Sequence, residues 1–198
     1  MTRIEMLRDR WEKIQTLNLK AGAHSPDSTF CVMEAAAFVA GETWSDNPEC
    51  VCSVIGAFMR AWNDGLATDA DRDRLLKPLI PKLLNTRAPA LEERRSLMAA
   101  DWLVRVHMVA WLRLAGLNSQ ADRIVSLPEI TSMGQIPSIK TVIDAAWDAA
   151  RAAAGDAAGA AAGKKLASTL DELQLSAVAL VERMCALSDE AREHASND

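Results

Sequence analysis

Residues 166–191 read LASTLDELQLSAVALVERMCALSDEA, and this stretch decides the fold. Its apolar residues recur at alternating spacings of four and three along all 26 positions. They are Leu166, Leu170, Leu173, Ala177, Leu180, Met184, Leu187 and Ala191, and we call this set the leucine seam. Such a 4-3 alternation fills the a and d positions of a coiled coil. The stretch therefore predicts a long helix that packs against another straight helix.

An alanine-rich tract precedes the leucine seam and is in phase with it. Alanine, the best helix former, occupies 12 of the residues 145–162. Gly155, Gly159 and Gly163 interrupt the tract, and each costs about 1 kcal/mol relative to alanine inside a helix. Residues 138–193 are therefore expected to form either one coiled-coil rod or an alanine-rich helical hairpin. The seam would find its partner helix in the tract or in another chain.

The rest of the chain has the spacing of short amphipathic helices separated by proline and glycine. The expected helices cover about 3–18, 25–41, 47–65, 68–85, 90–115 and 120–126. Pro78 and Pro81 are expected to kink or split the fourth of them. Residues 127–137 contain two prolines and one glycine and are the expected domain boundary. We therefore predict an all-α protein, with a multi-helix domain over 1–127 and a C-terminal helical extension over 138–193.

Composition excludes several classes of protein. The chain has 198 residues, 49% of them hydrophobic and 25% charged, which is the balance of an ordinary folded protein. Its net charge of −5 and scattered basic residues argue against binding to nucleic acid. It contains no apolar run long enough for a membrane helix and begins with mixed acids and bases, so we expect neither a membrane span nor a signal peptide. Four unevenly spaced cysteines favour a reducing cytoplasm.

Several longer motifs carry a resemblance to a known family. The strings are CVMEA at 31–35, AGETWSDNPEC at 40–50, FMRAWND at 58–64, DWLVR at 101–105 and WLRLAGL at 111–117. With them the chain resembles a family of uncharacterised proteins of actinobacteria and their phages, in which an alanine-rich tract of variable length precedes the last helix. The resemblance covers most of the chain. It implies no activity, because none is assigned to the family.

The densest group of reactive side chains lies within residues 24–52. The candidate metal ligands are His24, Cys31, Cys50 and Cys52, since zinc is usually held by Cys, His and carboxylate side chains. The Cys50-x-Cys52 spacing is shorter than in zinc knuckles, which favours a structural interpretation. In that interpretation Cys31 is a small buried residue, Cys50 and Cys52 lie near a helix start, and Asp46 or Asn47 caps that helix. A thiol activated at the helix start is the third alternative.

Glu34 interrupts an otherwise apolar segment, and a buried carboxylate must be paired or protonated. Its expected partners are Arg60 and Arg105. A structural ion pair, or a hydrogen bond to the following loop, is favoured over a general-acid role shared with Glu42.

Trp44 lies in a predicted loop between Glu42 and Asp46, and these three residues are the candidate binding residues. An exposed tryptophan is a common anchor in protein interfaces. The alternative is that Trp44 plugs the neighbouring helix ends. Four other tryptophans fall on apolar helix stripes, where core packing is favoured: Trp11, Trp62, Trp102 and Trp111.

No catalytic motif is assembled, and no phosphate-binding loop or cofactor motif is present in the sequence. We therefore name no catalytic residue and expect no cofactor. The sequence favours a non-enzymatic protein-interaction module that self-associates as a homo-oligomer and acts on a host or cellular protein. The residues expected to self-associate are Leu166, Leu170, Leu173, Leu180, Met184 and Leu187. The alternative function is a small metal- or thiol-dependent enzyme that uses Cys31, Glu34, Glu42, Asp46 and Cys50.

Overall fold

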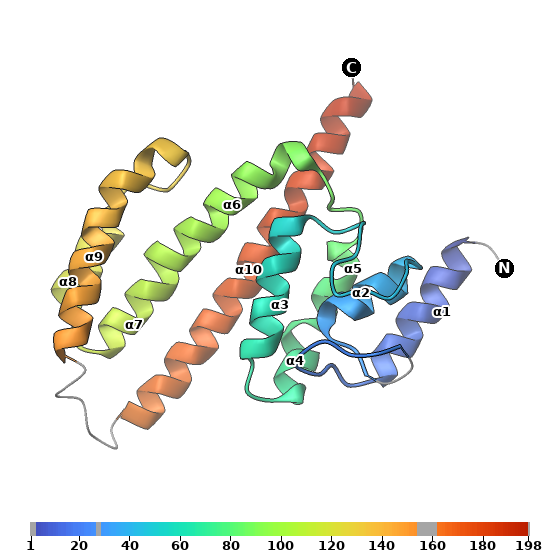
Figure 1. Cartoon of the computed structure of the whole chain (residues 1–198), viewed down its shortest axis with the longest axis horizontal. Helices are drawn as coiled ribbons and strands as arrows, with labels where there is room; N and C mark the ends of the chain where they lie inside the picture. The colour runs from blue at the N-terminus through green and yellow to red at the C-terminus, as the bar shows by residue number, and fades with distance from the viewer. Residues whose placement is uncertain (1–2, 27–28, 154–161, 198) are drawn as a thin grey trace. The chain divides into compact units, whose positions relative to one another are not determined.

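The computed structural model describes residues 3–26, 29–153 and 162–197, and the regular elements in these ranges are helices (Figure 1). The predicted all-α fold is confirmed. One isolated β-bridge pairs Leu19 with Phe30 in the loops that flank residues 27–28. In the described ranges, no helix has the length and apolarity that crossing a membrane requires.

The chain divides into two compact units. The first comprises Met1–Arg95 and Val181–Asp198, and the second comprises Ser96–Leu180. This division differs from the predicted one into 1–127 and 138–193. Two helices, α6 (Glu92–Asp101) and α10 (Ala162–Asn197), run from one unit into the other.

Short helices build the first unit around α2. Apart from parts of α6 and α10, its elements are α1 (Arg3–Thr16), α2 (Val32–Ala40), α3 (Ser53–Gly65), α4 (Asp69–Leu75), the 3-10 turn η1 (Lys77–Leu79), α5 (Ile80–Leu83) and the 3-10 turn η2 (Pro89–Leu91). Helix α2 contacts α1, α3 and α5, and nearly all of its residues are buried. A short helix without an exposed polar face needs such neighbours on every side.

Three predicted helices of the first unit differ in their boundaries. The helix expected from residue 25 begins at Val32, because Cys31 and Glu34 form a capping box there. The helix expected from residue 47 begins at Ser53. The helix expected over 68–85 is split into α4, η1 and α5 at its two prolines, as predicted, because proline removes a backbone donor.

The second unit packs α7, α8 and α9 together. Its elements beyond α6 and α10 are the π-helix η3 (Trp102–Met108), α7 (Val109–Leu114), α8 (Asn118–Val125), the 3-10 turn η4 (Met133–Gln135) and α9 (Ile136–Ala153). Ala146 of α9 is buried in a cluster with Leu112 and Ile124, and Ile139 is buried with Leu97 and Ile130. These contacts pack α9 into the second unit. Gly155 and Gly159, where a hairpin turn was expected, lie outside the described residues.

A buried guanidinium joins α6 to the C-terminal part of α10 within the first unit. Arg95 is fully buried. Its Nε donates to the carbonyl oxygen of Met184 at 3.0 Å, its Nη1 to that of Thr86 at 2.7 Å, and its Nη2 to Ser188 Oγ at 2.5 Å. Among the described residues, no carboxylate forms an ion pair with it. Because a buried charge is costly unless it is hydrogen-bonded, these three acceptors hold α10 on the first unit.

Replacing Arg95 with methionine should lower the free energy of unfolding by about 3 kcal/mol, because hydrogen bonds from a buried charge are lost together. The change keeps a long apolar side chain and removes only the guanidinium. Chemical denaturation followed by circular dichroism measures the effect. Arg94→Met is the matched control, since Arg94 is exposed. Equal stability of the two variants would contradict the role given to Arg95.

Candidate functional site

Glu34 is buried to 1% exposure, and its carboxylate organises the loop that precedes α2. Oε1 accepts the backbone N–H of His24 at 2.6 Å, and Oε2 accepts that of Cys31 at 2.7 Å. The Nδ1 atom of His24 lies 2.9 Å from Oε2. The expected partners of Glu34 were wrong: Arg60 donates to the carbonyl oxygen of Asp46, and Arg105 pairs with Asp101. Glu34 is therefore satisfied locally and has a structural role.

The cysteines named in the sequence analysis have structural positions. Cys31 is the N-cap of α2, where its Sγ accepts the N–H of Glu34 at 3.4 Å. Burial raises the pKa of Cys31 to about 12 and, together with the neighbouring Glu42, that of Cys50 to about 12. Burial raises the pKa of Cys185 to the same value. Cys52 is buried at the start of α3. A nucleophilic thiol needs a lowered pKa, so these environments do not support a thiol-dependent enzyme.

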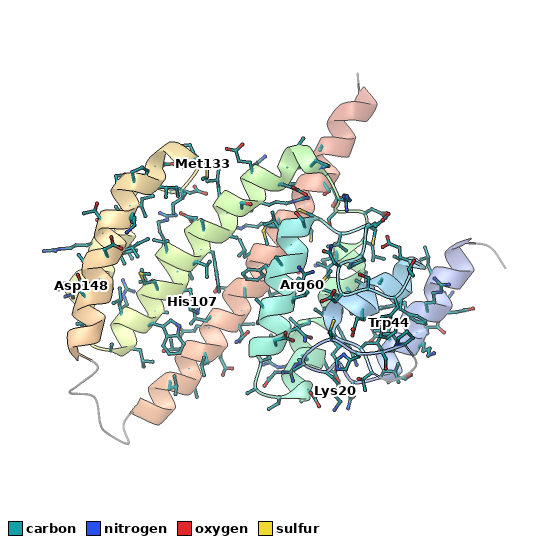
Figure 2. All side chains as sticks on the ribbon, in the orientation of Figure 1. Lys20, Trp44, Arg60, His107, Met133 and Asp148 are labelled. Carbon is teal, nitrogen blue, oxygen red and sulfur yellow. The ribbon has the colours of Figure 1, made fainter. Side chains whose placement is uncertain are left out.

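The candidate binding loop is tied down by its own side chains. Glu42 accepts the N–H groups of Glu49 at 2.6 Å and Cys50 at 2.8 Å. Trp44, labelled in Figure 2, donates from Nε1 to the carbonyl oxygen of His24 at 2.8 Å, and its ring lies 4.9 Å from that of Phe30. Trp44 is half-buried rather than exposed. This geometry matches the alternative, a plug over the helix ends, and not the exposed anchor expected with Glu42 and Asp46.

The metal hypothesis gains no support from the described residues. Within them, no three His, Cys, Asp or Glu side chains come together in a way that could hold a metal ion. The imidazole of His24 pairs with the carboxylate of Glu34, and Cys50 contacts Glu42.

The leucine seam is divided between core and surface. Its later members are buried within the chain: Leu173, Ala177, Leu180, Met184 and Leu187. Four of them were expected to self-associate, but they are core residues here. Leu166 and Leu170 are 37% and 38% exposed. The seam therefore packs against its own chain from residue 173 onward and is uncovered before it.

Exposed apolar side chains gather in the second unit. Among the described residues, the exposed large hydrophobic side chains are Leu103, Val106, Trp111, Val125, Met133, Leu166, Leu170 and Leu175. Every one of them belongs to Ser96–Leu180. Exposed apolar surface is the usual mark of an interaction site, so the second unit is where a binding function is to be sought.

An apolar pocket lies beside the π-helix of this unit. Its volume is about 490 Å³, and it is lined by Leu103, His107, Met108, Trp111, Leu112, Ala115 and Ala146. Pockets of about 300–1,000 Å³ with mostly apolar walls are typical of small-molecule sites. π-Helices are rare and are often found at functional sites. Trp111 was expected in the core, but it is 36% exposed at this pocket.

His107, which Figure 2 labels, is hydrogen-bonded to Trp111 in the pocket wall. Trp111 Nε1 lies 3.1 Å from His107 Nε2. Because an indole N–H can only donate, Nε2 is unprotonated and the imidazole carries its proton on Nδ1. Burial lowers the pKa of His107 below the usual 6.5, which favours this neutral form. No described residue accepts a hydrogen bond from Nδ1.

The sequence analysis missed this pocket because a π-helix has no periodicity signal of its own. One hint was present: Leu103, His107, Trp111 and Ala115 recur at intervals of four. In an α-helix such a row drifts by about 40° per step and does not stay on one face.

Comparison with known proteins gives no match: no family model, curated protein or solved structure is significantly similar to the chain. The resemblance suggested by the sequence motifs therefore stays a prediction, and the function must be argued from the site.

Native thiols should react slowly with iodoacetamide. With a pKa of about 12 instead of 9.0, Cys31, Cys50 and Cys185 hold about a thousandfold less thiolate than in the unfolded chain at about pH 8. Mass spectrometry of timed labelling, with the urea-unfolded chain as control, measures this. Labelling of Cys31 or Cys50 in the native chain at the unfolded rate would restore the thiol hypothesis.

Protonation of His107 should destabilise the fold. Since burial lowers its pKa in the folded chain, the unfolded chain binds the proton first as the pH falls. The contribution of the neutral ring is complete above about pH 6.5 and is lost as the pH falls through the lowered folded value. Denaturation titrations of the parent and of His107→Gln, at neutral and mildly acidic pH, measure this. The variant should lose less stability on acidification, and an equal loss would show that His107 does not contribute.

Proposed function

We propose that the chain is a non-enzymatic interaction module that pairs with a second copy of itself through the second unit. The observation that carries the proposal is the gathering of exposed large apolar side chains in Ser96–Leu180. The first unit has none among its described residues. A chain that satisfies its buried polar groups and leaves apolar surface open on one unit has the features of a binding protein.

The uncovered beginning of the leucine seam is the proposed centre of the contact. Leu166 and Leu170 lie one helical turn apart on one face of α10. The 4-3 spacing of the leucine seam is suited to packing against a straight helix. The same stretch of a second copy offers such a helix. In a two-fold symmetric interface the same residues of both copies contribute to the contact. The short apolar stripe on one copy can therefore pack against the same stripe on the other.

The assembly state of the full chain tests the proposal. We expect sedimentation velocity to show a dimer at micromolar concentration, and Leu166→Gln with Leu170→Gln to shift it to monomer. Glutamine keeps helix propensity, and both leucines are partly exposed, so the free energy of unfolding should change by about 1 kcal/mol or less.

Leu175→Gln is the matched control. Leu175 is 62% exposed on the same helix but lies off the seam, so its replacement should leave the dimer intact. A monomeric parent chain throughout the micromolar range overturns the proposal. So does a dimer that is unchanged in the double variant.

A further inference from the structure

The pocket beside η3 has walls from three elements of the second unit. Leu103, His107, Trp111 and Ala115 come from η3, α7 and the residue that follows α7. Ala146 of α9 closes the opposite side, and its small side chain leaves the volume of about 490 Å³ open. Leu103 and Trp111 are partly exposed at the same time. The pocket is therefore accessible from solvent.

The described lining extends along the helix. It runs from Leu103 to Ala115, an advance of about twelve positions, which corresponds to ~18 Å at the α-helical rise. The row at intervals of four lines one pocket because η3 is a π-helix. The wider π turn rotates less per residue than an α turn and so reduces the drift of the row. A lining that extends along the helix in this way is suited to a chain-like ligand.

The described lining carries no charged side chain. It consists of apolar residues, Trp111 and His107, and the imidazole is in its neutral form when Nε2 accepts from Trp111. A carboxylate or phosphate placed here would be desolvated without a counter-charge, which is costly. The pocket therefore selects against anions, and the complementary ligand is uncharged.

One polar atom remains for recognition. The proton of His107 is on Nδ1, and no described residue accepts it. Small-molecule pockets commonly combine apolar walls with a few polar groups that fix the orientation of the ligand. A ligand with one hydrogen-bond acceptor, such as an ester or ketone oxygen, would satisfy Nδ1.

We propose that this pocket binds a neutral, elongated apolar molecule, of the class of fatty-acyl esters, whose carbonyl oxygen accepts a hydrogen bond from His107 Nδ1. The site is separate from the leucine seam, because no seam residue lines it.

Fluorescence of the neutral probe N-phenyl-1-naphthylamine tests the site in the full chain. We expect saturable binding at one site per chain in the micromolar range. Methyl laurate should displace the probe, and laurate, which has the same chain but carries a charge, should need at least about tenfold higher concentration. Equal displacement by the two overturns the neutral-ligand assignment.

Two variants locate the site. Ala115→Trp places a large side chain at an exposed lining position and should weaken probe binding at least about tenfold, whereas Ala90→Trp, at an exposed alanine of the first unit, should not. His107→Phe keeps an aromatic ring and removes Nδ1, so it should retain probe binding and weaken methyl laurate about fivefold to tenfold. Probe binding that is unaffected by Ala115→Trp overturns the pocket assignment.

The variant with Leu166→Gln and Leu170→Gln separates this proposal from self-association. It should bind the probe with the affinity of the parent chain whether or not the parent dimerises. If probe affinity instead falls as the protein is concentrated into a dimer, a second copy occupies the pocket and the ligand proposal is wrong.

Discussion

A buried guanidinium held by neutral oxygen atoms is the constraint on which the C-terminal helix depends. Arg95 reaches three neutral oxygen atoms, and two of them, on Met184 and Ser188, belong to α10. If this part of α10 moved away, the guanidinium would lose two of its three acceptors, so the helix and the arginine support each other. The exposed pair of Lys82 and Glu182 adds little by comparison, because surface ion pairs are weak. The later leucine seam is thereby committed to the chain's own core.

The two units differ in how their polar and apolar side chains are placed. In the first, each buried polar side chain has a partner: Glu34 accepts three donors, and Arg72 donates to the carbonyl oxygens of Asn63 and Leu66. Buried polar networks that are fully satisfied make one arrangement rigid and specific. The second unit leaves large apolar side chains in water and encloses an apolar pocket. The physical argument for binding therefore rests on the second unit.

Periodicity was enough to predict the helices but not their partners. The 4-3 spacing from Leu166 correctly indicated a long helix, yet it could not indicate that residues from Leu173 onward pack on their own chain, since spacing carries no information about the partner. Glu34 was correctly judged structural, but its donors are backbone N–H groups and His24, which no charge pairing would indicate. The pocket was missed because Trp111 was assigned to an apolar stripe of a regular α-helix. The π-helix η3 instead changes the rotation per residue, so that Leu103, His107 and Trp111 line one pocket.

Residues of the continuous helical segment formed by η3 and α7 line two different pockets. Leu103, His107 and Trp111 line the pocket beside α9, while Val106 and Arg113 line a second groove with Glu172 of α10. A ligand in the pocket and a partner at α10 would therefore touch opposite sides of η3 and α7. Coupling between them requires an element with two discrete states that both sites bias. Conversion of the π turn to α-helix would rotate Leu103 relative to Trp111 and break the row that lines the pocket. A ligand that fills the row favours the π form, and any effect on α10 would have to act through that preference.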